Sequence, residues 1–173
     1  MTALVFVDTN VLVYARDAGE TRKQRLATSW LALLWRERSG RTSVQVLSEY
    51  YVTVTRKLTP GLPHAVAWDD VQNLLSWQPA AVDANILRRA RDVEERHHLS
   101  WWDSLIVGAA QLQNCAVLLS EDLQDGGVYG SVTVRSPFTF AVSEPLAEYQ
   151  QVGSVKRSHP RRGRPKLARE SLG

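Results

Sequence analysis

A short apolar strand that ends in an acid places the strongest constraint on how this chain can fold. Residues 4–7 form a continuous apolar run rich in β-branched and aromatic side chains, which is typical of a strand buried on both faces of a parallel sheet. The run stops at Asp8, and Thr9 and Asn10 then favour the start of a helix. Asp8 is therefore predicted at the carboxyl edge of a sheet, where α/β proteins bind ligands.

The remainder of the chain alternates helical periodicity with short apolar runs. The first of these helices is predicted to begin at a Thr21 cap, to run to about Arg38 and to be stopped by Gly40. Two more are predicted from a Ser43 cap to about Lys57 and over 64–76. The last two are predicted from an Asp83 cap through Glu94 and from Ser100 through Leu112. Strands are predicted over 77–82, 116–119 and 131–134, with a turn at Gly126-Gly127. This alternation predicts an α/β fold, a three-layer α/β/α sandwich around a short central parallel sheet.

Charge divides the 173-residue chain into a body and a tail. The whole chain has 21 Lys or Arg and 18 Asp or Glu. Residues 154–173 carry seven of the basic residues and one of the acids, so residues 1–153 hold 14 basic and 17 acidic side chains. We expect one domain over 1–140, a connecting segment over 141–153, and a basic tail over 154–173 that is too polar to fold alone and is disordered. Such a tail is typical of nucleic-acid-binding segments.

Cysteine content and hydropathy indicate the compartment. A single cysteine, Cys115, excludes an internal disulfide framework. No apolar run approaches the roughly 20 residues of a membrane span, and the first apolar run lacks a basic leader and contains Asp8. We therefore expect a cytoplasmic protein.

Carboxylates follow or flank buried segments at four places, Asp8, Glu49, Asp103 and Asp122. Taken singly, each has an ordinary structural explanation. Asp8 can cap the helix after the first strand, and Glu49 can be an exposed helix residue. Asp103 fits a Ser-x-x-acid capping box, and Asp122 can be a surface turn residue.

Together, the four acids favour a metal site. Asp8 and Asp122 both follow buried parallel strands, so they are expected at the same edge of the sheet. Several carboxylates in one place repel one another unless a cation neutralises them, and all-oxygen ligation suits Mg²⁺ or Mn²⁺ rather than zinc. A receiver-like signalling domain also gathers acids around Mg²⁺, but it would need a lysine after a later strand, and no lysine occurs between Lys57 and Lys156.

Four blocks of sequence carry a family resemblance. They are Val7-Asp8-Thr9-Asn10, Ser43-Val44-Gln45-Val46-Leu47-Ser48-Glu49-Tyr50-Tyr51, Leu99-Ser100-Trp101-Trp102-Asp103-Ser104-Leu105-Ile106 and Leu118-Leu119-Ser120-Glu121-Asp122-Leu123-Gln124-Asp125-Gly126. In order and spacing they closely resemble the acidic blocks of PIN-domain nucleases, and most of all those of the VapC-type toxins of bacterial toxin–antitoxin modules. The resemblance covers about residues 3–138.

The resemblance implies a PIN-like fold and a metal-dependent endoribonuclease that acts as the toxin of a toxin–antitoxin pair. It implies that Asp8, Glu49, Asp103 and Asp122 are the catalytic acids and ligands of Mg²⁺ or Mn²⁺, with Glu121 or Asp125 as alternatives for the fourth acid. Thr9, Asn10 and Ser120 match polar positions that support the acids or the metal. An RNA substrate, an antitoxin protein and a homodimer are the implied partners.

Basic residues outside the acidic blocks leave alternatives open. Arg161, Arg162, Arg164 and Lys166 lie in a stretch that resembles an AT-hook core, so the tail is expected either to contact the minor groove of A·T-rich DNA or to bind RNA or DNA generally. A non-catalytic nucleic-acid-binding protein of the same fold, using this tail, is the alternative function. The clusters Arg22, Lys23, Arg25 and Arg88, Arg89, Arg91 either line an approach for RNA or form solvated helix faces.

Overall fold

A five-stranded sheet organises the structure, a computed structural model that describes residues 2–139. The strands are β1 (Val5–Val7), β2 (Gly40–Arg41), β3 (Val117–Leu119), β4 (Val128–Tyr129) and β5 (Val132–Arg135), in the spatial order β2-β1-β3-β5-β4. The first four in that order run parallel, and β4 pairs antiparallel with β5 at the edge. The predicted connecting segment from residue 141 and the basic tail lie outside the described residues.

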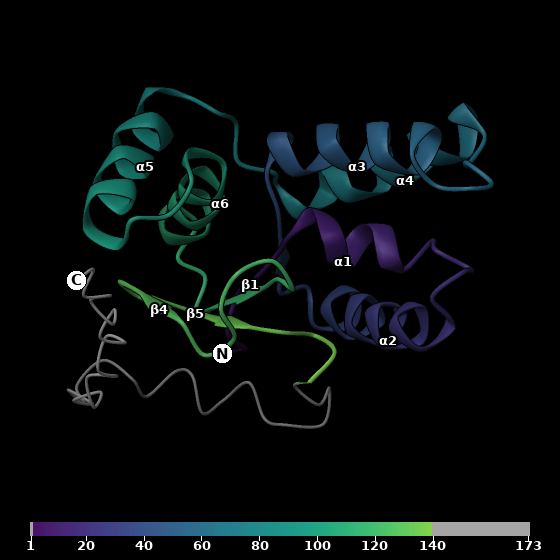
Figure 1. The fold of residues 1–173 in the computed structure, drawn as a ribbon, viewed down its shortest axis with the longest axis horizontal. Helices are drawn as coiled ribbons and strands as arrows, with labels where there is room; N and C mark the ends of the chain where they lie inside the picture. The colour runs from purple at the N-terminus through teal and green to yellow at the C-terminus, as the bar shows by residue number, and fades with distance from the viewer. Residues whose placement is uncertain (1, 140–173) are drawn as a thin grey trace, which may run out of the picture.

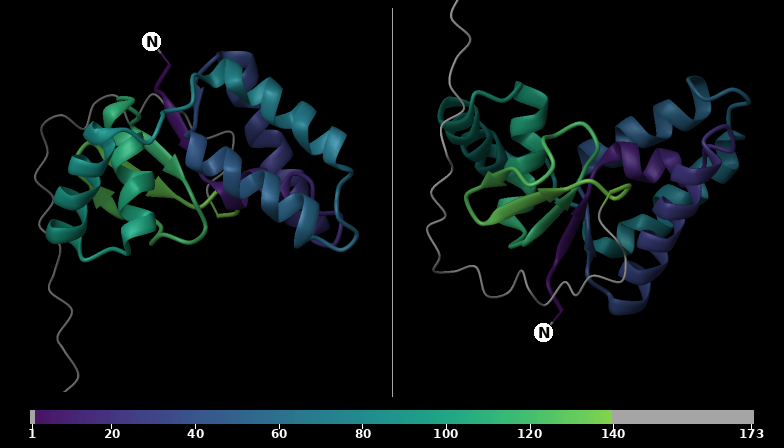
Figure 2. Two further views of the ribbon diagram at one scale, coloured as in Figure 1. Left: turned by 90° about the horizontal axis from the view of Figure 1, so that it is seen from above. Right: turned by 60° about the horizontal axis from the view of Figure 1, so that its bottom comes forward.

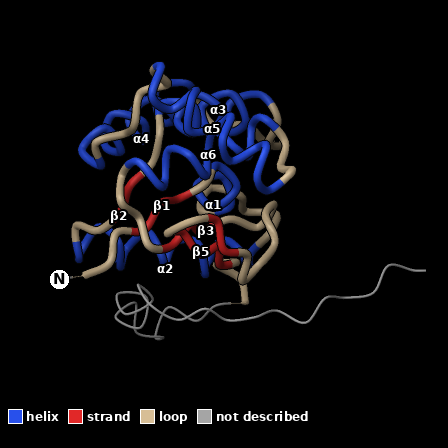
Figure 3. The backbone as a smooth tube through the Cα atoms, turned by 90° about the vertical axis from the view of Figure 1, so that its left-hand side faces the viewer, coloured by secondary structure: helices blue, strands red, loops and turns tan. Residues whose placement is uncertain are grey.

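Helices cover both faces of the sheet, which confirms the predicted α/β architecture (Figures 1 and 3). They are α1 (Thr9–Tyr14), α2 (Thr21–Glu37), α3 (Val44–Arg56), α4 (His64–Leu74), the short 3-10 helix η1 (Leu75–Trp77), α5 (Ala84–His97) and α6 (Trp101–Leu112). Helix α6 contacts β3 and β5, and α2 lies on the opposite side of the strands. The α3–α4 pair and the α5–α6 pair stand on either side of the chain's first strand (Figure 2).

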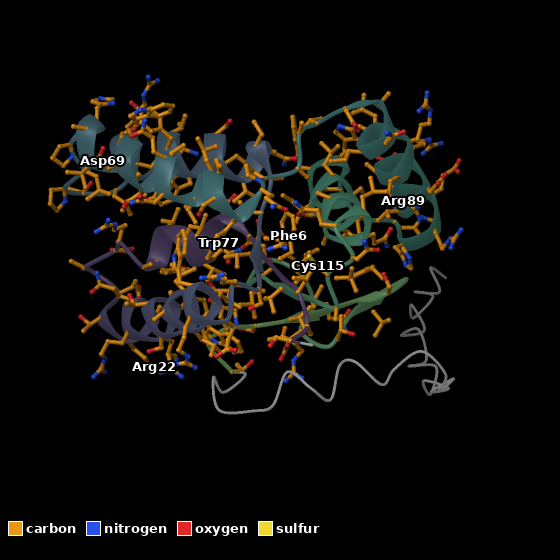
Figure 4. The ribbon with its side chains drawn as sticks, turned by 180° about the vertical axis from the view of Figure 1, so that it is seen from behind. Phe6, Arg22, Asp69, Trp77, Arg89 and Cys115 are labelled. Atoms are coloured by element: carbon orange, nitrogen blue, oxygen red, sulfur yellow. The ribbon has the colours of Figure 1, made fainter. Side chains whose placement is uncertain are left out.

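The core explains why the apolar runs form strands. All three side chains of β1 and all three of β3 are fully buried, as expected for strands covered on both faces. Phe6 lies at the centre of the molecule in Figure 4. On α2, Trp30 is fully buried and donates to the carbonyl of Pro137, whereas Trp35 is 42% exposed and packs on Trp77, so the two tryptophans do not share one apolar stripe.

Several predicted helix starts are confirmed by their capping bonds. Ser43 accepts from the Val46 N–H, Asp83 accepts from two N–H groups of α5, and Ser100 accepts from the Asp103 N–H. Thr21 instead is the first residue of α2, and Glu20 occupies the cap position without a side-chain bond. Helix α6 is buried along Ser104–Ala110, as its nearly all-round apolar sequence predicts.

Two predictions around Trp77 are wrong, and both errors share a tertiary cause. Gly40 does not stop α2, because Arg38 ends that helix in the left-handed conformation (φ 54°) and Gly40 lies in β2. A Cβ at Gly40 would lie 2.6 Å from the Trp77 ring, so the glycine makes room for the tryptophan. The predicted strand over 77–82 is absent, since Trp77 ends η1, Gln78 is left-handed, and only Ala80 forms a bridge, with Ser43.

The short strand β4 was not predicted, because its two residues are too few to produce a periodic signal. Within residues 2–139, no helix has the length and apolar character needed to cross a membrane.

Candidate active site at the carboxyl edge of the sheet

Asp8 lies at the carboxyl end of β1, where the chain passes directly into α1. Its backbone N–H still bonds to the carbonyl of Leu119 in the neighbouring strand (3.0 Å), so the sheet fixes its position. As the N-cap of α1, its Oδ1 accepts from the Thr9 N–H at 2.7 Å. Its Oδ2 accepts from the Ser120 hydroxyl at 2.8 Å, which ties β1 to the residue that follows β3. The capping role predicted for Asp8 is therefore real, but it uses only one of the two carboxylate oxygens.

The Asp8 carboxyl group is buried, being only 8% exposed. Its pKa is raised from 3.8 to about 6. Burial is the largest cause and the negative charges of Asp122 and Glu49 act in the same direction, whereas the bonds from Ser120 and Thr9 lower the pKa. The ionised form of this carboxyl group is thus held in a place that disfavours negative charge. A cation beside it would relieve both the burial and the repulsion.

Asn10 and Ser120 link Asp8 to Asp122. The Asn10 amide donates to Asp122 Oδ2 at 3.0 Å and lies 3.5 Å from Asp8 Oδ2, so one amide group faces both acids. The Ser120 hydroxyl oxygen accepts from the Asp122 N–H at 3.2 Å, and the Asn10 side-chain oxygen accepts from the Glu121 N–H at 3.3 Å. These bonds hold the turn after β3 against the start of α1, as the parallel-strand argument predicts.

Glu49 reaches the same edge of the sheet from α3. Its Oε2 accepts from the Thr9 hydroxyl at 3.0 Å, and its Oε1 accepts from the Gln45 amide at 3.0 Å. Thr9, Asn10 and Ser120 therefore each bond to at least one of the predicted acids. Gln45 does so too, and sequence reasoning missed it, although its position one helical turn before Glu49 is a usable signal.

Asp103 stands apart from this hydrogen-bonded group. Its N–H donates to the Ser100 hydroxyl oxygen at 3.1 Å, which is one half of the predicted capping box. Its carboxylate accepts from the Ser100 hydroxyl at 2.7 Å, in place of the Ser100 N–H that a full capping box would use. Among the described side chains, Asp103 has no bond to the other three acids, and within residues 2–139 no three acidic, histidine or cysteine side chains are gathered closely enough to hold a metal ion as they stand. Asp8, Glu49 and Asp122 are brought together, and Asp103 is not joined to them.

The two alternatives for the fourth acid have other partners. Glu121 forms an ion pair with Lys23 of α2, and the Lys23 ammonium also lies over the Tyr14 ring. Asp125 accepts from Arg135 Nε at 3.2 Å and from the Ser136 N–H at 2.9 Å. Of these three neighbouring acids, only Asp122 bonds to Asn10 through its carboxylate, which favours it as the fourth acid.

The predicted basic clusters are largely used within the fold. Arg22, labelled on α2 in Figure 4, donates to the carbonyl of Phe138, and Lys23 is paired with Glu121. On α5, Arg91 forms ion pairs with Glu94 and Glu95. Neither cluster presents three free cations, which supports the interpretation as helix faces for most of these residues. The tail residues Arg161, Arg162, Arg164 and Lys166 lie outside the described residues.

A polar cluster that sequence reasoning missed joins the segment after α1 to α3 and α4, with Tyr50 buried, Asp70 half-buried and Arg16 exposed. Arg16 forms a two-pronged ion pair with Asp70, and the Tyr50 hydroxyl donates to Asp70 Oδ2 at 2.5 Å. Burial, followed by Asp70, raises the pKa of Tyr50 well above its usual value, so the phenol stays protonated. The three side chains line a hollow of about 650 Å³ whose other walls include Leu31 and Trp35.

The fold and the site together define an α/β protein with an acidic site at the carboxyl edge of a parallel sheet. The PIN domain model matches residues 5–124, which contain all four predicted acids, and the chain therefore belongs to the PIN domain family. Its structure is similar to the crystal structure of VapC20 of Mycobacterium tuberculosis, described as a sarcin-ricin loop cleaving toxin. The TM-score is 0.54 at 22% identity, over 75% of this chain and 98% of VapC20. No curated protein matches the sequence.

Proposed function

We propose that the chain is a divalent-metal-dependent endoribonuclease that acts as the toxin of a toxin–antitoxin pair. The observation that carries the proposal is the buried Asp8 carboxyl, joined through Ser120 and Asn10 to Asp122 and flanked by Glu49. Membership of the PIN domain family and the fold shared with VapC20 support the same activity. An antitoxin protein and a second copy of the chain are the proposed partners, and the cytoplasm is the proposed location.

The side chains at the site fit a hard divalent cation in their chemistry. All four acids offer carboxylate oxygens, the ligands that Mg²⁺ and Mn²⁺ prefer, and Asp8 is both buried and close to two further negative charges. Asp8, Glu49, Asp103 and Asp122 would hold the ion. When bound, the ion would stabilise the negative charge that builds on an RNA phosphodiester and lower the pKa of the attacking water.

The chain's own polar groups orient the acids for this task. The Ser120 hydroxyl and the Thr9 N–H each occupy one oxygen of Asp8, so that carboxylate cannot rotate freely. The Thr9 hydroxyl and the Gln45 amide hold the two oxygens of Glu49 in the same way. Because these donors come from three different elements of the fold, the acids remain in place before substrate arrives, which is the preorganisation that catalysis requires.

Cleavage of total RNA tests the proposal directly. We expect defined cleavage sites with Mg²⁺ or Mn²⁺, no cleavage with EDTA, and no cleavage by Asp8→Asn or Asp103→Asn, since a neutral side chain loses the charge that binds the ion. The exposed Asp69→Asn on α4 is the matched control, because it removes the same charge away from the site. Wild-type cleavage by either neutralised variant would refute the acid assignment. An absence of cleavage under all metal conditions would favour the non-catalytic nucleic-acid-binding alternative.

A further inference from the structure

A second hollow, which we name the α5 pocket, lies between α5, the end of α6 and the turn from β4 to β5. Its volume is about 260 Å³, its polar lining residues are Arg89, Asp92, Arg96, His97, Gln111 and Ser131, and Val93 and Gly130 complete its walls. Figure 1 shows α5 and α6 side by side with β4 near their ends. The pocket shares no lining residue with the acidic site around Asp8.

The two arginines of the α5 pocket differ from the other arginines of the same helix. Arg88 donates to Asn85, and Arg91 is paired with Glu94 and Glu95. Within residues 2–139, Arg89 and Arg96 have no hydrogen bond and no ion pair. Two unpaired guanidinium groups, seven residues apart on one face of a helix and lining one hollow, are suited to bind an anion.

The walls of the α5 pocket are held in place from both sides. The aliphatic part of Arg89 lies against α6 at Gly108, where an added Cβ would lie 3.2 Å from Arg89 Cγ. On the opposite wall, the Gln111 amide donates to the Tyr129 carbonyl at 2.9 Å and fixes the turn. Gly130 has a positive φ of 62°, a conformation that favours glycine, and a glycine adds no side chain to this wall.

The charge of the α5 pocket matches a phosphodiester. Asp92 lines the same hollow and offsets one of the two arginines, so these three side chains together carry one net positive charge. A backbone phosphate of RNA carries one negative charge. Arg89, Arg96 and the Ser131 hydroxyl supply donors of the kind that contact phosphate oxygens.

One end of the α5 pocket, at His97, is close to Asp103 along the chain. His97 ends α5, and only the connection over 98–100 separates it from α6, which carries Asp103 in its first turn. The His97 ring packs edge-on against Tyr129 with ring centroids 5.0 Å apart.

We infer that the α5 pocket binds a backbone phosphate of the RNA, outside the nucleotides that contact the acids. This inference rests on the proposed function, because the ligand that it assigns to the pocket is the RNA that the acidic site would cut. The sequence did not show which basic residues of this helix, if any, contact the RNA backbone. The inference assigns that contact to Arg89 and Arg96. The pocket reads no base, so it adds affinity and register rather than sequence preference.

Fluorescence anisotropy on the full chain tests the inference, with EDTA present so that RNA is not cut. The probes are fluorescein-labelled single-stranded RNAs of about 16 and about 4 nucleotides, the range of site sizes common for such RNA. Arg89→Ala/Arg96→Ala should weaken binding of the longer RNA about tenfold and lower the slope of log K against log[salt] by about 0.7, because the pocket holds one phosphate and each lost phosphate contact on a single strand is worth about 0.7. The shorter RNA, which does not span both sites, should be affected less.

The control is Arg88→Ala/Arg91→Ala, which removes the same charge from the same helix outside the pocket. It should leave the salt slope nearly unchanged, and Arg89→Lys/Arg96→Lys should restore most of the slope. Equal losses in both alanine pairs, or no loss in either, would overturn the inference. The result is separate from the proposed function, because binding through the pocket can persist in a protein that fails to cut RNA, and cleavage can persist without the pocket.

Discussion

Replacing Asp8 by asparagine should make the metal-free protein more stable at neutral pH. The Asp8 carboxyl titrates near pH 6 in the folded protein and near 3.8 when unfolded. Between these values the native state binds more protons than the unfolded state, so the free energy of unfolding of the wild type falls as pH rises from about 4 to about 6. At about 1.4 kcal/mol per pKa unit, the whole loss is about 3 kcal/mol.

Asparagine removes this loss but gives up one hydrogen bond. Its side-chain oxygen can accept from the Thr9 N–H, but its NH₂ group then faces the Ser120 hydroxyl and the Asn10 amide in place of an acceptor. A lost bond of this kind costs about 1 kcal/mol. We therefore expect Asp8→Asn to exceed the wild type by about 1–2 kcal/mol near pH 7.5 and to match it within about 1 kcal/mol near pH 4.

Urea unfolding of both proteins in EDTA, at several values from about pH 4 to about pH 8, measures this difference. The exposed Asp69→Asn provides the control, since its carboxyl group makes no bond in the described structure and its replacement should show no such pH dependence. A stability difference between Asp8→Asn and the wild type that stays constant across this pH range would refute the reasoning. Added Mg²⁺ should stabilise the wild type and leave Asp8→Asn unchanged, because only the wild type retains the charge that binds the ion.

Three further results are expected. Gly40→Ala should destabilise the protein by about 1–3 kcal/mol in urea unfolding, because a Cβ there would lie 2.6 Å from the Trp77 ring, and a neutral result would mean that Trp77 can move. Cys115 is buried with its pKa raised to about 12 by burial, so a thiol reagent should label it only as the protein unfolds, and rapid labelling of the native protein would contradict its placement. Deletion of residues 154–173 should weaken nucleic-acid binding and flatten its salt dependence, whereas an unchanged slope would exclude the tail from binding.

The sequence predicts the acidic edge of the sheet well because the prediction depends on local patterns and one topological rule. The apolar runs before Asp8 and Ser120 form β1 and β3, and these strands pair in parallel with Val7 opposite Leu119. Residues that follow paired parallel strands must meet at one edge, so Asp8 comes next to Ser120 and Asp122 without any knowledge of the helices. The capping residues Ser43, Asp83 and Ser100 are equally local and equally well predicted.

Features that depend on a distant side chain could not be predicted. Gly40 has the residue type of a helix stop, and only the position of Trp77 shows that it makes room for a ring. The sequence also cannot distinguish Arg89 from Arg91, because the ion pairs of Arg91 and the hollow beside Arg89 arise from the packing of α5 on α6. For Asp103, the capping box is visible in the sequence, but its distance from the other acids depends on how α6 sits on the sheet.

The energetics of Asp8 favour the proposed role of a metal-binding acid over that of a purely structural helix cap. Serine and asparagine cap helices about as well as aspartate, and neither carries a charge that burial penalises. If residue 8 were needed only to accept the hydrogen bond from the Thr9 N–H, a neutral capping side chain would therefore make the folded protein more stable. Asp8 instead keeps a carboxyl whose ionised form is disfavoured by burial, by Asp122 and by Glu49. Such a group lowers the stability of the metal-free protein and gains a favourable partner only when a cation binds, which is the balance expected of a site selected for chemistry rather than for folding.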